Sequence, residues 1–482
     1  MVTDTQPQRD EPHPIHPTPY RPSWGLVVAI MSGTLLNPLN SSMIAVALIS
    51  LQSAFGVGTA TASWLISGFY LAAAIGMPVM GRLADLLGAR RVFCAGLVLV
   101  GAIGALAPLA PSFGFLVAFR ILQAFGTSAA YPAGLAILRR GDPAGKAPAS
   151  ALGALTVAGS ISAALGPVLG GSLVGAAGWQ AIFLVNVPVT VAGLLMALRW
   201  LPKDEPRATR PSSSVSSPAQ LWHTLDFPGI LLFSGTIAAA LGFLISLSGT
   251  KIWPLLVVAL LGGGLLFWRE RRAATPFLDV TMLAQNRSLL GIFLQYAAIN
   301  IVFYGIFFGL PLWLERARAF HPQEAGLLVL PVAGMGVIST PIAAWLVRRH
   351  GARPALIIGS TTLLAGSLLL LLPNLQTPLV VIVFVGCVLG IPNGFNNLGL
   401  QAALYEITPP EIMGQTGGQF QTFRYIGAIL STALLGLIFG STATSTELHT
   451  MALVLAIISA LLLLASIGAR RQPRERTSRA AP

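Results

Sequence analysis

Charged residues are scarce in this sequence, and acidic residues are the scarcest. Only 9% of its 482 residues are charged, with 16 aspartates and glutamates against 29 lysines and arginines. Hydrophobic residues make up 54% of the chain, and the mean hydropathy is +0.76. Since a soluble domain needs a charged surface to stay in solution, this balance excludes a soluble protein and favours one that crosses a membrane many times.

Cysteine is nearly absent, and so are the residue patterns of most enzymes. Cys94 and Cys387 both lie in apolar runs, so neither a disulfide framework nor a thiolate metal site is expected. The chain has no glycine-rich lysine loop for nucleotide phosphates, no cluster of metal ligands and no catalytic triad arrangement. We therefore expect no enzyme activity, no cofactor and no metal.

Long apolar runs fill most of the chain, and about 14 of them are long enough to cross a bilayer as helices. They lie at residues 24–51, 64–80, 92–109, 113–138, 149–174, 179–201, 227–248, 252–268, 288–314, 325–347, 354–372, 379–400, 414–440 and 448–467. Of the 29 lysines and arginines, Lys251, Arg316 and Arg318 fall on one side of the predicted membrane and Arg120 and Arg424 within it, which leaves 24 on the other side. This bias makes nucleic acid an unexpected partner. It predicts a protein of the lipid bilayer with both termini cytoplasmic.

The predicted fold is an all-α membrane protein with two six-helix bundles and an extra helix pair between them in the chain. The expected units are a cytoplasmic tail at 1–22, a first bundle at 23–201, a cytoplasmic linker at 202–225, the extra pair at 226–268, a second bundle at 269–468 and a basic cytoplasmic tail at 469–482. Residues 344–353 repeat the position of residues 81–91, each after the second helix of its set, although Arg348 stands where the first copy has Asp85. This repetition predicts two related bundles that enclose a cavity near the midplane of the membrane.

Residues 81–91 are interpreted as a charged turn between the second and third helices. Gly81 and Gly88 would allow the backbone to turn closely. Asp85 would accept hydrogen bonds from a neighbouring helix N-terminus or pair with an arginine, while Arg90 and Arg91 would hold the turn on the cytoplasmic side. The alternative is a positive-inside anchor with no role in gating.

Polar side chains at helical spacing within the apolar runs mark a candidate transport site. An isolated charge in lipid is costly, so Arg120 should face a cavity or a partner, and it shares a helix face with Gln123, Thr127 and Tyr131. Later runs add cavity candidates at Tyr296, Asn300, Tyr304, Phe308, Asn393, Asn397, Gln401, Gln419 and Arg424. Aromatic walls with sparse amides suit a small, amphipathic organic substrate. The alternatives are an Arg120 bonded to helix carbonyls and interhelical hydrogen bonding by the other polar residues.

Three stretches of the sequence resemble motifs of the major facilitator superfamily. Residues 81–91 resemble its loop signature Gly-x-Leu-Ala-Asp-Arg-x-Gly-Arg-Arg, which implies a gating role, with Leu86 and Ala89 in place of basic residues. Residues 120–126 resemble Arg-x-x-Gln-Gly-x-Gly, whose arginine takes part in proton or substrate coupling in that family. Residues 162–171 resemble the antiporter signature Gly-x-x-x-Gly-Pro-x-x-Gly-Gly of drug exporters, carried by Gly166, Pro167, Gly170 and Gly171. The small residues by themselves predict only close helix packing, with a bend at the proline.

The extra helix pair, together with residues 179–188 and 226–229, resembles the fourteen-helix drug/proton antiporter branch of that superfamily. The resemblance covers nearly all of residues 24–467. It implies a multidrug-exporter-like protein in the inner (plasma) membrane of a bacterium that works by alternating access and antiports protons. In double-membraned bacteria it also implies a periplasmic adaptor.

Asn40 is the sharpest departure, because it replaces an acid of the first helix that titrates in proton-coupled members, and an amide cannot do so. The acids nearest the helix ends, Asp226, Glu315 and Glu406, are interpreted as solvated boundary charges. Because no buried acid matches Arg120 and Arg424, a potential-driven exporter of an anionic metabolite or siderophore is the alternative. A membrane sensor or partner protein that no longer transports is the alternative from another class.

Overall fold

The structure is a computed structural model that describes residues 22–140, 149–204, 226–247, 251–273, 276, 284–408, 413–439 and 444–468, without the side chains of residues 85, 139, 140, 149, 150, 152, 153, 156, 245, 405, 413–415 and 418. Within these ranges the regular structure is entirely helical. Fourteen segments are long and apolar enough to cross a membrane. They correspond one to one with the fourteen apolar runs, so the predicted all-α membrane fold is confirmed.

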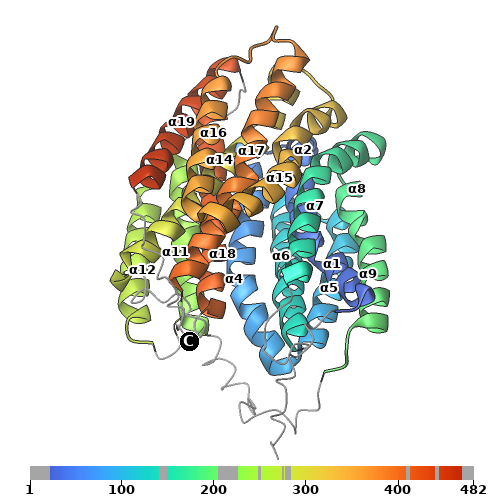
Figure 1. Ribbon diagram of the computed structural model, residues 1–482. Helices are drawn as coiled ribbons and strands as arrows, with labels where there is room; N and C mark the ends of the chain where they lie inside the picture. The colour runs from blue at the N-terminus through green and yellow to red at the C-terminus, as the bar shows by residue number, and fades with distance from the viewer. Residues whose placement is uncertain are drawn as a thin grey trace, which may run out of the picture.

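The first bundle contains the first six spans (Figure 1). Its helices are α1 (Trp24–Thr34), α2 (Leu36–Phe55), α3 (Thr59–Ala62), α4 (Trp64–Leu87), α5 (Ala89–Leu106), α6 (Phe113–Arg140), α7 (Ala149–Ala177), α8 (Ala181–Leu184) and α9 (Asn186–Trp200). Helices α1 and α2 together form the first span, and α8 and α9 form the sixth. Helix α7 continues through Pro167 without interruption.

The second bundle is preceded by the extra pair, α11 (Phe227–Ser246) and α12 (Trp253–Glu270). Its own helices are α14 (Arg287–Ala317), α15 (Pro322–His350), α16 (Ala352–Leu369), α17 (Leu379–Ile407), α18 (Met413–Phe439) and α19 (Ser445–Gly468). The pair is central in the chain but peripheral in space, because α11 packs against α18 and α4 while α12 lies on its outer side (Figure 1). Only 17% of the residues of α12 are buried inside the protein, which fits a helix that faces lipid.

The basic stretch forms a sharper turn than the sequence predicted. Helix α4 continues to Leu87, so Gly81 belongs to the helix and not to the turn, because the leucines and alanine of residues 82–87 are good helix formers. The chain reverses at Gly88, whose φ of 110° suits glycine, and α5 starts at the next residue. Gly351, with φ 82°, makes the equivalent turn between α15 and α16. The predicted repeat is therefore present in the backbone.

The two ends of the molecule differ in how the bundles meet. We call the end that holds Gly88 and Gly351 the basic end, and the end where α14 meets α15 the opposite end. Among the buried residues described, one apolar cluster crosses both bundles and includes Ile44, Phe69, Phe308 and Leu435. Two further clusters lie toward the basic end, one within each bundle. The bundles thus share a core toward the opposite end and keep separate cores at the basic end.

Candidate transport site

A buried polar cluster ties three helices of the first bundle together. Asn40 of α2 and Asn186 of α9 exchange hydrogen bonds, at 2.6 Å from Asn40 Nδ2 to Asn186 Oδ1 and 3.0 Å in return. Gln123 of α6 donates to Asn40 Oδ1 at 3.0 Å. Asn40 also donates to the carbonyl oxygen of Leu36 at 2.9 Å. An amide suits this position because it donates and accepts at once, which an ionised carboxylate cannot do.

Arg120 joins the same cluster and is only 2% exposed. Its guanidinium donates to Gln123 Oε1 at 2.8 Å and to the carbonyl oxygen of Asn40 at 3.2 Å. It also lies over the ring of Phe69, 4.4 Å from the centroid. Arg120 therefore points into the first bundle and bonds a helix carbonyl. This is the alternative to a cavity-facing arginine that the sequence left open. Its role in coupling stays a prediction.

The rest of the polar stripe on α6 turns away from that cluster. Thr127 accepts a hydrogen bond from Asn37 of α2 at 3.1 Å. Tyr131 lies further along α6 toward the basic end and is within electrostatic reach of Tyr296, which belongs to the second bundle. The stripe predicted from helical spacing is thus divided between the interior of one bundle and the interface between the two.

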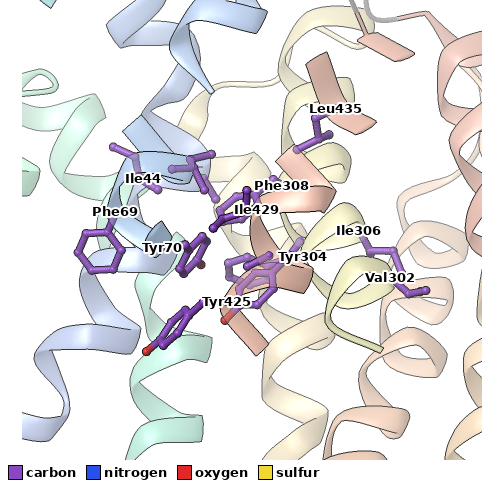
Figure 2. Close-up of a cluster of buried hydrophobic side chains, with 14 of the residues drawn as sticks. Ile44, Phe69, Tyr70, Val302, Tyr304, Ile306, Phe308, Tyr425, Ile429 and Leu435 are labelled. Carbon is purple, nitrogen blue, oxygen red and sulfur yellow. The ribbon is translucent and has the colours of Figure 1, made fainter. Parts of the chain in front are cut away.

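Aromatic side chains occupy the centre of the interface between the bundles (Figure 2). Tyr70 of α4 lies against Tyr304 of α14 and Tyr425 of α18, with ring centroids 5.0 and 5.7 Å away. Tyr304 stacks in turn on Phe308 at 5.8 Å. Figure 2 shows the Tyr425 hydroxyl pointing away from Leu435, which lies nearer the opposite end. The cluster is therefore apolar toward the opposite end and carries hydroxyl groups toward the basic end.

Arg424 of α18 borders this aromatic cluster in the second bundle. It donates to the Tyr304 hydroxyl at 3.1 Å, and Tyr296 and Tyr425 are also close enough to interact with its charge. Tyr296 is fixed by stacking on Phe420, with centroids 3.8 Å apart and planes 4° from parallel. The structure thus brings Arg424 of α18 together with Tyr296 and Tyr304, which the sequence placed on one and the same earlier span.

Other predicted cavity residues lie elsewhere. Asn300 donates to the carbonyl oxygen of Tyr296 at 2.7 Å, a hydrogen bond within α14. Asn397 donates to Asn393 Oδ1 at 2.6 Å along α17, where Asn393 packs beside Gly336 of the same bundle. Gln419 is five residues from Arg424, which places it about 140° around α18 and away from the aromatic cluster. No contact described here joins these residues to Arg424.

The antiporter-like motif contacts other helices through two faces of α7. A Cβ on Gly170 would lie 3.0 Å from Cα of Met43, and one on Gly166 would lie 2.6 Å from Cβ of Ser42, so this face packs on α2 of the same bundle. On the other face, a Cβ on Gly171 would lie 2.9 Å from Cα of Gln323 in α15. The backbone of Pro167 meets Gly326 of α15. The motif therefore seals the opposite end by bringing two bundles into backbone contact.

Two further contacts between the bundles reinforce this closure. Arg316 at the end of α14 donates to Gln52 of α2, and the hydroxyls of Ser67 in α4 and Thr432 in α18 share a hydrogen bond. Neither pair carries a signal in the sequence, because each joins residues more than 250 positions apart.

Three acidic residues at the basic end have roles that sequence reasoning missed. Asp204 accepts hydrogen bonds from the backbone N–H groups of Arg90 and Arg91 at 3.1 and 3.0 Å, so it caps α5. This is the role predicted for Asp85, whose side chain lies outside the described residues. Asp226 was interpreted as a solvated charge, which is wrong: it is 3% exposed and forms an ion pair with Arg269. Arg269 also pairs with Glu270 at 3.0 Å.

The described residues contain no group of three or more histidines, cysteines or acids that could hold a metal ion. The remaining boundary acids differ, since Glu406 is exposed and Glu315 is partly buried beside Arg316. The site can therefore bind through aromatic faces, hydroxyl groups and a single guanidinium.

Comparisons with known proteins agree with this architecture. The chain is 37% identical over 444 residues to the uncharacterized MFS-type transporter YwoD of Bacillus subtilis, covering 92% of this chain and 96% of that protein. It is 28% identical to the tetracenomycin C resistance and export protein of Streptomyces glaucescens (92% and 80% covered) and 25% identical to the riboflavin transporter RibZ of Clostridioides difficile (92% and 95%). Among solved structures it resembles the peptide transporter POT, with a TM-score of 0.69 at 14% identity over 93% of this chain and 96% of that one. The model of the Major Facilitator Superfamily matches residues 30–432, and the chain belongs to that superfamily.

Proposed function

We propose that this transporter exports drugs or other amphipathic organic compounds across the bacterial inner membrane by alternating access. The observation that carries the proposal is the aromatic and hydroxyl-bearing cluster of Tyr70, Tyr304 and Tyr425, which lies between the bundles beneath a sealed opposite end. Similar proteins named for tetracenomycin C export and multidrug resistance support the direction and the substrate class. In this proposal the basic end is cytoplasmic and the structure represents the state that loads substrate from that side.

Proton antiport is the proposed coupling, and Glu315 is the carboxylate we assign to it. Asp226 is ion-paired, Glu406 is exposed, and Asn40 has no titrating group. Glu315 is partly buried in α14 at the sealed end, next to the Arg316 that bonds the other bundle. A proton that binds there would change the charge at a contact that must break when the opposite end opens.

Flux of a fluorescent amphipathic dye in proteoliposomes tests both parts of this proposal. The wild-type protein should give saturable flux driven by a pH gradient, Glu315→Gln should abolish the effect of the gradient, and Glu406→Gln should leave it unchanged. No saturable flux with any driving force would contradict export and favour a membrane sensor or partner protein.

A second candidate is a potential-driven exporter of an anionic metabolite or siderophore. Arg424 favours it, because the groups that act most strongly on its charge are the neutral phenols of Tyr296, Tyr304 and Tyr425. An inside-negative potential would favour exit of an anion by about 2.3 kcal/mol per charge per 100 mV without any proton. Flux driven by a potential alone, and indifferent to a pH gradient, would select this candidate.

A further inference from the structure

Arg424 differs from Arg120 within the membrane and from Arg269 at the basic end in what satisfies its charge. Both terminal nitrogens of Arg120 donate, one to Gln123 and one to a helix carbonyl, and Arg269 pairs with two carboxylates. Among the described residues Arg424 donates to one phenol hydroxyl, that of Tyr304, and its buried Nε has no hydrogen-bond partner, as is also true of Arg120 Nε. A guanidinium that reaches only neutral groups in a membrane interior retains a strong preference for an anion.

The residues around Arg424 belong to both bundles, as a substrate site in an alternating-access transporter requires. On α18, Gln421 and Tyr425 lie about 60° and 100° around the helix from Arg424, on the side that faces the first bundle. From the first bundle, Asn37 reaches Tyr425 and Tyr131 approaches Tyr296. The Oε1 atom of Gln421 is buried and has no hydrogen-bond partner among the described residues. An unpaired donor and an unpaired acceptor thus lie one helical turn apart on α18.

Charge and ring chemistry together narrow the class of ligand. Tyrosine rings alone would attract a cation through their faces, but a cation beside Arg424 would be repelled. Arg424 is a single guanidinium, which can hold one carboxylate by two parallel hydrogen bonds or the single oxygen of one phenolate. The rings of Tyr70, Tyr304 and Tyr425 pack on one another beside that charge and offer their edges to a ligand.

We propose that this site recognises an aromatic or conjugated organic anion with a single negative charge, whose acidic group binds Arg424 and whose ring packs against the basic-end side of the cluster formed by Tyr70, Tyr304 and Tyr425. The inference rests on the proposed function, because it names the substrate class of that same site. It assigns the reading of substrate charge to Arg424 alone and gives Arg120 no part in it. The hydroxyl of Tyr304 positions the guanidinium.

Binding of three matched probes to the purified protein in nanodiscs tests the assignment. Naphthalene-2-carboxylic acid, its primary amide and 2-(aminomethyl)naphthalene share one ring system and differ in charge. We expect the acid to bind at least tenfold more tightly than the amine. Arg424→Gln should weaken binding of the acid ten- to a hundredfold and change binding of the amide less than twofold.

Two further variants keep the test decisive if Arg424→Gln fails to fold. Arg424→Lys keeps the charge and should keep the preference for the acid at reduced affinity, and Tyr304→Phe should weaken the acid severalfold while sparing the amide. Arg349→Gln is the matched control, because it removes an exposed arginine that lies over Trp345 at the basic end. The affinities of the three probes should be unchanged in this variant.

Several outcomes would overturn the inference: binding of the amine as tight as that of the acid, no acid binding at millimolar concentration, or an equal loss of acid and amide in Arg424→Gln. Failure of the proposed function is a separate result. It would be seen as selective binding of the acid to the wild-type protein without saturable flux of any of the three probes in proteoliposomes.

Discussion

Replacing Gly171 by alanine should shift the conformational equilibrium of the transporter without unfolding either bundle. The new Cβ would lie 2.8 Å from the carbonyl carbon of Pro322 and 2.9 Å from Cα of Gln323. Both are backbone atoms of α15, so no side-chain rotation can relieve the contact, and α7 and α15 must separate by several tenths of an ångström. Overpacking of this kind costs about 1–3 kcal/mol.

That cost applies only while the opposite end is closed, because α7 and α15 belong to different bundles. The ratio of closed to open molecules should therefore fall about 5- to 150-fold, which is the range that 1–3 kcal/mol corresponds to. Gly159→Ala is the matched control. It lies on the same helix, and a Cβ there would meet nothing within 4 Å.

Spin labels at Ser53 and Leu375 can measure the change, since both residues are exposed at the opposite end and lie in different bundles. Cys94 and Cys387 would first be replaced by serine. Gly171→Ala should add or enlarge a population with a longer distance between the labels, and Gly159→Ala should match the parent. If Gly171→Ala left the distance distribution unchanged, the claim that this backbone contact holds the opposite end closed would be wrong.

Three other substitutions test the polar contacts. Asn40→Asp should lower stability by about 2 kcal/mol, because a carboxylate cannot donate to Asn186 as the amide does, and thermal unfolding in detergent would show it; an unchanged midpoint would contradict the cluster. Asp204→Ala should remove the cap of α5 at a cost of about 1 kcal/mol, seen as faster hydrogen exchange confined to the first turn of that helix. Arg269→Leu should cost about 3 kcal/mol by leaving Asp226 buried without its arginine, and Arg269→Lys should retain most of the stability. Equal stability of the two Arg269 variants would argue against the ion pair.

Local signals in the sequence predicted most of the fold. Each apolar run is long enough to span the membrane by itself, and a helix is the structure in which such a run satisfies its own backbone hydrogen bonds. Gly88 also follows from local chemistry, because a positive φ between two helices favours glycine. The error at Gly81 has the same origin, since a glycine before a charged stretch looks like a turn although the helix continues for six more residues.

The candidate site was predictable only in part, because helical spacing gives a face but not what that face meets. Arg120, Gln123 and Tyr131 lie on one stripe of α6, yet the first two turn to Asn40 inside the bundle and Tyr131 lies near the second bundle. Asp226 looked solvated because its partner, Arg269, is 43 residues away in the chain.

The sequence by itself determined that this protein lies in a membrane, where its helices run and which end carries the positive charge, because hydropathy and charge act locally along the chain. Tertiary structure decided which polar residues are consumed by packing and which remain for a ligand. That outcome depends on partners brought together from distant helices. Asn40 and Arg120 are hydrogen-bonded to each other and to Gln123 within one bundle, whereas Arg424 lies at the interface with Tyr304 as its one hydrogen-bond partner among the described residues.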